Sequence, residues 1–103
     1  VFTVKVCMDQ IWIQKIEPTE GGWRVFVEAG KVRQEVLDYV VEVDREYWKA
    51  IAPKRTIEEL IRGTFRFLLA RESKESILRK FNLRVVQGYF PEFEESIKKE
   101  LSL

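Results

Sequence analysis

The sequence of 103 residues contains no histidine. Without histidine, the chain lacks the usual general base of serine and cysteine hydrolases and the commonest metal ligand. Aspartate is also scarce, and its three residues, Asp9, Asp38 and Asp44, have no calcium-loop spacing. Gly21-Gly22 is not followed by the pattern of a phosphate-binding loop. We therefore expect a chain that is not an enzyme and holds no metal or cofactor.

Cysteine and long apolar runs are nearly absent as well. The single cysteine, Cys7, has no partner for an intramolecular disulfide, which is typical of a reducing compartment. The longest strongly apolar run, Phe67-Leu68-Leu69-Ala70, is far shorter than the ~20 residues of a membrane span. No basic-then-apolar leader is visible. The expected location is the cytoplasm, away from the membrane.

The residues that are present have the composition of one globular domain. Hydrophobic residues make up 46% and charged residues 34%, and the formal net charge is +1. A chain of this length corresponds to a single domain, which we divide into a strand half, 1–43, and a helical half, 44–103. Fourteen glutamates and nine lysines against one asparagine are typical of a thermophile.

Alternating apolar residues predict strands in the first half. The alternation runs through Ile11 and Ile13, then Trp23, Val25 and Val27, then Leu37, Tyr39, Val41 and Val43, with turns at 18–22 and 29–31. Val4 and Val6 add an earlier apolar pair, and residues 8–10 are either a turn or a bend within one strand. This pattern predicts an antiparallel β-meander of three or four strands with one apolar face.

The period changes to that of helices from Asp44. Asp44 is a suitable N-cap for a short helix to Ile51, and Pro53 ends that helix. Thr56 and Glu59 match a capping box that begins a longer helix. The apolar arc of this longer helix is about twice the ~100° that a surface helix needs. It therefore packs on the sheet and also on either the C-terminal helices or a second copy of the chain.

Two further helices are expected after the longer one. Ser73 is placed to cap the first, with Ile77, Leu78 and Phe81 inward, and Asn82 interrupts it. Pro91 suits the first position of the last helix. The predicted fold class is therefore α+β, with the meander packed on one face by C-terminal helices.

The C-terminal half carries a resemblance to a known family. The segments 67–72 (FLLARE), 76–83 (SILRKFNL) and 89–93 (YFPEF) resemble a family of small prokaryotic proteins with the pattern FLLxRE…SILxxFxL…YFPE. The resemblance covers roughly residues 11–97, and the family has no established function. It implies one cytoplasmic domain of this size and transfers no activity.

The helical half also contains an excess of basic residues. Residues 54–84 hold nine basic and four acidic side chains. A candidate nucleic-acid or anion patch consists of Arg62, Arg66, Arg79, Lys80 and Arg84. The alternative interpretation is a solvated helix surface with local ion pairs.

Two other nucleic-acid motifs are suggested by the sequence. Residues 73–90 have the outline of a helix-turn-helix, but Leu78 stands where the motif needs a small residue. The tryptophans and Phe26 either stack on single-stranded bases or belong to the core.

The surplus of apolar surface indicates self-association. Gly63 and Ala70 flank Phe67 on the helical wheel and would let another backbone approach. The candidate interface consists of Gly63, Phe67, Ala70, Tyr89 and Phe90. The sequence thus predicts a non-enzymatic protein-interaction or regulatory module, a homodimer with a further protein partner of unknown identity. The alternative is a nucleic-acid-binding regulator that uses the basic patch.

Overall fold

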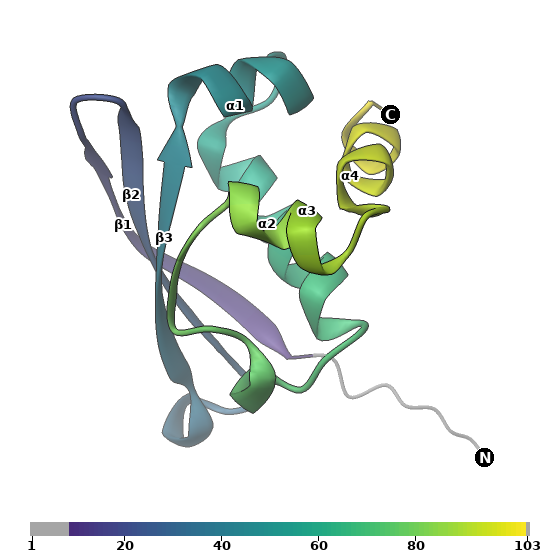
Figure 1. Ribbon diagram of the computed structural model, residues 1–103. Helices are drawn as coiled ribbons and strands as arrows, with labels where there is room; N and C mark the ends of the chain where they lie inside the picture. The colour runs from purple at the N-terminus through teal and green to yellow at the C-terminus, as the bar shows by residue number, and fades with distance from the viewer. Residues whose placement is uncertain (1–8, 103) are drawn as a thin grey trace.

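The computed structural model describes residues 9–102, which form a sheet with helices on one of its faces (Figure 1). The strand predicted around Val4 and Val6 lies outside the described residues, and so do Cys7 and Met8. The predicted α+β class is confirmed. In chain order, the elements are β1 (Gln10–Pro18), β2 (Gly22–Gly30), the 3-10 turn η1 (Arg33–Glu35), β3 (Leu37–Asp44), α1 (Arg45–Ile51), α2 (Ile57–Leu69), the 3-10 turn η2 (Lys74–Ser76), β4 (Lys80–Asn82), α3 (Arg84–Tyr89) and α4 (Phe93–Leu101).

The described strands form a mixed sheet in the order β1-β2-β3-β4. The first three are the predicted antiparallel meander, and β4 pairs in parallel with β3 through Val41 and Phe81. Gly22 begins β2 where a Cβ would lie 1.9 Å from the carbonyl oxygen of Val43, so only glycine fits there. The sheet therefore has two edges, β1 and β4, and these edges locate the side chains discussed below.

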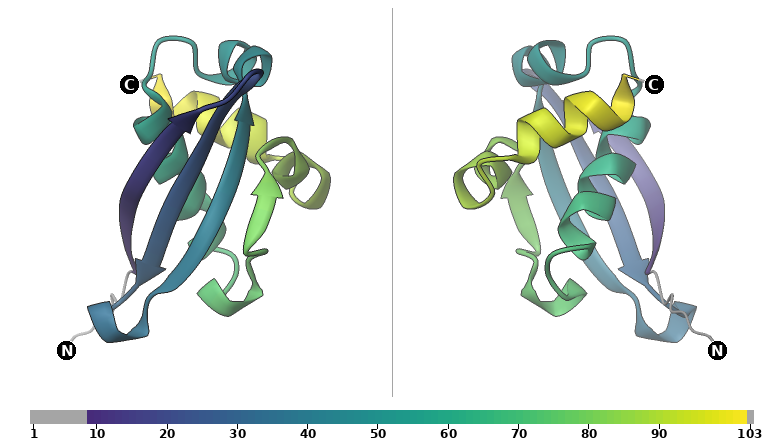
Figure 2. Two further views of the ribbon diagram at one scale, coloured as in Figure 1. Left: turned by 90° about the vertical axis from the view of Figure 1, so that its left-hand side faces the viewer. Right: turned by 90° about the vertical axis from the view of Figure 1, so that its right-hand side faces the viewer.

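The helices cover one face of the sheet and leave the other uncovered (Figure 2). The residues predicted to face inward, including Val25, Val27, Tyr39 and Val41, are buried on the covered face. The helix α2 lies on this face, and α4 crosses over it. A single apolar core thus joins the strand half to the helical half.

The capping box at the start of α2 is confirmed. The Thr56 side chain accepts a hydrogen bond from the backbone N–H of Glu59, and the Glu59 carboxylate accepts one from the Thr56 N–H. The wide apolar arc is covered by the sheet on one side and by α4 on the other. A Cβ on Gly63 would lie 3.4 Å from Cδ1 of Ile97, which shows how closely α4 approaches.

The prediction of a helix from Ser73 through Phe81 is wrong. The chain makes only the short turn η2 and then joins the sheet as β4. The β3 edge offers unpaired backbone groups, and Val40 N–H donates to Arg79 O while Leu83 N–H donates to Glu42 O. Strand pairing therefore overrides the helical spacing, and Leu78 is half-exposed instead of inward.

Two predicted helix starts also differ in detail. Asp44 occupies the N-cap position of α1 but makes no capping hydrogen bond. Its carboxylate accepts instead from Nε of Arg84, at 2.6 Å. Pro91 lies in a turn, and α4 begins at Phe93 with Glu92 as its N-cap. Pro91 ends α3, because the residue before a proline, here Phe90, favours extended backbone. Pro91 does not begin α4, which starts two residues later at Phe93.

Candidate functional site

The first two members of the basic patch are on α2 and have partners. Arg62 donates to the backbone oxygen of Ile11 at 2.7 Å and pairs with Glu58 at 3.2 Å. Arg66 donates through Nε to Glu100 on α4 at 2.9 Å. Both guanidinium groups thus tie α2 to neighbouring elements, and Arg62 lies at the β1 edge of the sheet.

The other three members lie at the opposite edge, on or beside β4. Arg84 pairs with Asp44, and its guanidinium lies 4.9 Å from the centre of the Tyr47 ring. The Arg79 guanidinium lies 5.9 Å from the centre of the Tyr39 ring. Among the side chains of residues 9–102, Lys80 has no ion-pair partner. The structure therefore separates the basic residues into two groups, one on α2 and one on or beside β4.

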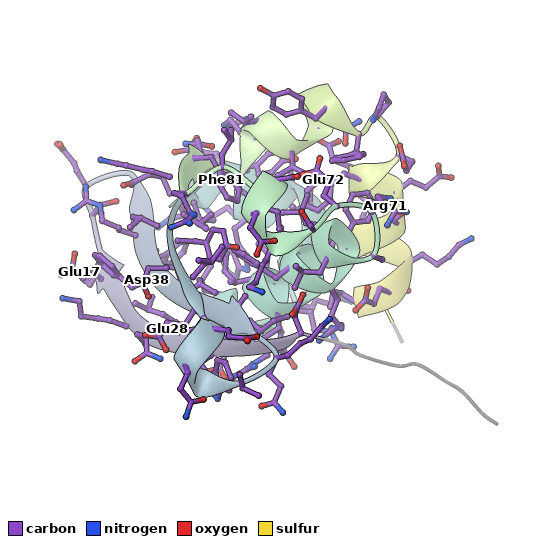
Figure 3. All side chains as sticks on the ribbon, turned by 90° about the horizontal axis from the view of Figure 1, so that it is seen from below. Glu17, Glu28, Asp38, Arg71, Glu72 and Phe81 are labelled. Atoms are coloured by element: carbon purple, nitrogen blue, oxygen red, sulfur yellow. The ribbon has the colours of Figure 1, made fainter. Side chains whose placement is uncertain are left out.

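The uncovered face of the sheet presents aromatic residues beside acids. Trp12, Phe26 and Val40 are half-buried there. Cross-strand pairing puts three basic and four acidic side chains on the same face, namely Lys15, Arg24, Lys80, Glu17, Glu28, Asp38 and Glu42. In Figure 3, Glu28 and Asp38 lie on this side, away from the helices. The excess of carboxylates disfavours a phosphate backbone at this face.

The remaining tryptophans, Trp23 and Trp48, pack together at the end of the sheet. Their rings meet edge to face with centres 5.6 Å apart, and the Trp48 indole N–H donates to the carbonyl of Arg55. These contacts are typical of partly buried structural tryptophans and leave the indole of Trp48 satisfied.

Two residues of the predicted interface, Gly63 and Phe67, are buried within the chain. Gly63 lies beneath α4, and the Phe67 ring makes edge-to-face contacts with Phe90 and Phe93. Ala70 is exposed at the end of α2. The close approach that the sequence indicated at Gly63 is made by α4 of the same chain.

The other predicted interface residues, Tyr89 and Phe90, line an apolar cleft between α3, β4 and η2. We call this the α3 cleft, and it encloses about 160 Å³. Its floor consists of the buried residues Leu68, Ile77, Phe81 and Val86, and its exposed rim of Leu78, Val85 and Tyr89. Glu72, Ser76 and Phe90 complete the lining.

The rim gathers most of the exposed apolar side chains. Tyr89 is 67% exposed, Leu78 50% and Val85 38%. Among the residues that the structure describes, only two other large hydrophobic side chains, Ile16 and Val32, are exposed. Clustered exposed apolar residues around a concavity mark interaction sites more often than scattered ones do.

Local structure explains why these residues converge. On β4, Phe81 points to the covered face of the sheet and forms the floor. On α3, Val85 and Tyr89 are four residues apart and share the outer face, while Val86 points inward. The sequence prediction missed Leu78 and Val85. The spacing of Val85 and Tyr89 was a usable signal, but the position of Leu78 depends on β4.

The α3 cleft has the size and polarity of a side-chain pocket. An apolar cavity of about 150 Å³ accommodates benzene, so the cleft has room for one aromatic or branched aliphatic side chain. Sites for drug-sized ligands and cofactors are larger, at about 300 Å³ or more. The polar side chains that line the α3 cleft are Glu72 and Ser76. The Ser76 hydroxyl lies 3.1 Å from the Ser73 hydroxyl.

Among the titratable groups of residues 9–102, the two core tyrosines Tyr39 and Tyr47 have the largest pKa shifts. Burial raises the pKa of Tyr39 to about 12, and its hydroxyl donates to Lys74 O at 2.6 Å. Burial, and secondly the hydrogen bond to Glu94, raise the pKa of Tyr47 further. Both phenols stay protonated at neutral pH and tie α4 and η2 to the core.

A wider depression of about 570 Å³ lies between the α1–α2 loop and the end of α4. Its lining includes Pro53, Lys54, Arg55 and Lys98. Arg55 is engaged with Glu59 and with the carbonyl of Leu101. No large exposed hydrophobic residue of the described chain lines this depression, which distinguishes it from the α3 cleft.

No protein-family model, curated protein or solved structure matches the chain. None of the helices in the described part is both long and apolar enough to cross a membrane. Within residues 9–102, no group of three or more acidic, cysteine or histidine side chains is gathered for a metal ion. The α3 cleft is therefore the feature of the described chain that points most clearly to a binding function.

Proposed function

We propose that the protein is a non-enzymatic protein-interaction module of the cytoplasm whose binding site is the α3 cleft. The observation that carries the proposal is the ring of exposed Leu78, Val85 and Tyr89 around a concavity of side-chain size. A partner segment would insert one apolar side chain between them. The partner would then cover the rim and exclude water from it.

The energetics of such an anchor are favourable. Burying one large apolar side chain contributes about 1.5–3 kcal/mol, and covering the rim adds to this. Binding energy at protein interfaces is concentrated in a few well-packed aromatic and apolar anchors. Tyr89 is the best candidate for such an anchor in this chain because it combines a large exposed ring with a polar tip.

A second copy of the chain is the alternative occupant of this same face. Gly63 and Phe67 are occupied by the chain's own helices, whereas Tyr89 remains open. Nucleic-acid binding has weaker support, because Arg62, Arg66 and Arg84 are paired with acids. Salt-dependent binding of DNA or RNA that weakens when Arg79 and Lys80 become alanine would restore that alternative.

Selection from a library of random linear peptides tests the proposal. The immobilised wild-type protein should enrich peptides that share an apolar residue. Their affinity, measured by fluorescence anisotropy, should fall by about tenfold or more in Val85→Asp, because a carboxylate would then replace an apolar rim contact. Val32→Asp introduces the same charge at an exposed valine that does not line the cleft, and should leave the affinity unchanged.

Two results would overturn the proposal. The first is a selection that enriches no peptide over a blank surface. The second is a set of enriched peptides whose affinity is the same for wild type and Val85→Asp. Circular dichroism of both variants checks that each has kept its fold.

A further inference from the structure

A single carboxylate, that of Glu72, stands at the edge of the α3 cleft. Glu72 follows α2, and its backbone N–H donates to Leu68 O at 2.8 Å, which fixes the position of the residue. The side chain is half-buried and shares the cleft lining with Leu68 and Phe81. The carboxylate thus borders apolar surface that the proposed partner would cover.

The Glu72 carboxylate has no hydrogen-bond or ion-pair partner among the described side chains. Its acidic neighbours differ in this respect. Glu75 pairs with Lys74 at 3.5 Å, and Glu92 pairs with Arg71 at 3.3 Å. Glu75 and Glu92 therefore each have a cation, whereas the carboxylate that lines the cleft has none among the described residues.

The two cations closest to Glu72 along the chain, Arg71 and Lys74, make other contacts. The Arg71 guanidinium donates to Phe67 O at 3.0 Å and lies over the Phe67 ring, 3.6 Å from its centre. The Lys74 side chain is mostly buried, with 14% exposure. Figure 3 shows Arg71 and Glu72 side by side on the helical side of the molecule. Neither cation is free to compensate Glu72 when a partner covers the cleft.

Covering an uncompensated carboxylate with an apolar segment has a cost. A partner that removes water from Glu72 without replacing its hydrogen bonds loses affinity. A partner with a cation beside its apolar anchor replaces those bonds and gains a charge-assisted contact. Charge complementarity therefore distinguishes between classes of partner at this cleft.

We infer that the α3 cleft recognises a basic, amphipathic segment of a partner protein, in which one apolar side chain enters the cleft and an adjacent lysine or arginine pairs with Glu72. This inference rests on the proposed function of the cleft. It adds the chemical class of the partner. Acidic segments are disfavoured because they would place a second carboxylate against Glu72.

A pair of synthetic peptides tests the charge requirement. One is a peptide enriched by the cleft, and the other is the same peptide with each lysine and arginine replaced by glutamine. The wild-type protein should bind the basic peptide about fivefold to tenfold more tightly, the range of one partly desolvated ion pair. This preference should shrink at high salt, because ions screen the contact.

Glu72→Gln should abolish the preference, so that both peptides bind with similar affinity. Glu20→Gln is the matched control, since Glu20 is exposed in the β1–β2 turn and does not line the cleft. The control removes the same unit of charge and should keep the full preference. Unchanged circular dichroism and melting temperature would show that neither variant acts through the fold.

The failure of this inference is distinguishable from failure of the proposed function. Peptides that depend on Val85 but show no basic preference, or a preference that persists in Glu72→Gln, would overturn the inference alone. A selection without any Val85-dependent peptide would overturn the proposed function and the inference together. Sedimentation of the protein alone as a dimer that Val85→Asp dissociates would assign the cleft to a second copy of the chain. That result would overturn the inference that the cleft recognises a basic partner segment.

Discussion

The Asp44 carboxylate, where β3 meets α1, accepts a 2.6 Å hydrogen bond from Nε of Arg84, the first residue of α3. The same guanidinium lies over the Tyr47 ring of α1. The wall of the α3 cleft is thereby connected to the end of the sheet by side chains forty residues apart. This connection supports the position of Val85 and Tyr89 on α3.

Removal of this ion pair should have a small effect on stability. Both side chains are about half exposed, so solvent screens their attraction. In a double-mutant cycle of Asp44→Ala and Arg84→Ala, we expect a coupling energy of about 0.5 kcal/mol, measured by urea unfolding. A coupling of zero would show that the pair does not hold α3 in solution.

Two glycines should respond in opposite directions to alanine. Gly22→Ala places a Cβ against the Val43 carbonyl oxygen and should lower the free energy of unfolding by at least about 2 kcal/mol. Gly63→Ala meets only the ends of side chains on α4, the nearest being Cδ1 of Ile97 at 3.4 Å, and gains helix propensity. It should raise the free energy of unfolding by about 0.5 kcal/mol. Chemical denaturation measures both changes, and a destabilised Gly63→Ala would show that α4 leaves no room for a Cβ at this position.

Loss of the capping box should destabilise α2. Thr56→Ala removes the acceptor for the Glu59 N–H, so we expect the free energy of unfolding to fall by about 1 kcal/mol. Ser73→Ala is the control, because Ser73 precedes η2 but makes no capping hydrogen bond. Its expected effect is below about 0.5 kcal/mol. Equal effects of the two substitutions would argue against the capping geometry.

Stability should fall at alkaline pH. The folded pKa of Tyr39 is about 12, above its ordinary value of 10.0. Between these values the unfolded chain releases the phenolic proton while the folded chain keeps it, so rising pH favours unfolding. The stability from this group is complete below pH 10.0 and is lost as pH rises through about 12.

Urea unfolding at a series of pH values measures this slope. Tyr39→Phe should be less stable than wild type at neutral pH, because the hydrogen bond to Lys74 O is lost. It should also lose stability less steeply above pH 10.0. Tyr47, whose pKa is also raised, would account for the slope that remains. An identical slope in both proteins would contradict the assignment to Tyr39.

The local patterns that predicted the fold correctly are those in which neighbouring residues determine the structure. The alternation of Leu37, Tyr39, Val41 and Val43 needs only one buried face, and the capping box needs only Thr56 and Glu59. These features follow from the period of side chains and from local hydrogen bonds. The meander and α2 were therefore predictable from the sequence.

The site was less predictable, because β4 is stabilised by a distant strand. Three residues are too few for a strand signal, and Ile77, Leu78 and Phe81 have helical spacing. Only pairing with β3 reverses the orientation of Leu78 and creates the α3 cleft. Tyr89 and Phe90 were predicted as interface residues, and both line the cleft. Gly63 was predicted there too, but α4 covers it.

Both proposals require that a partner segment binds in the α3 cleft. A titration of ¹⁵N-labelled protein with an enriched peptide, followed by two-dimensional NMR, tests it most directly. We predict that the backbone amide signals of Leu78, Val85 and Tyr89 shift, while those of Trp12 and Phe26 on the uncovered face do not. Shifts confined to the uncovered face, or no shifts at saturating peptide, would show that the α3 cleft is not the binding site.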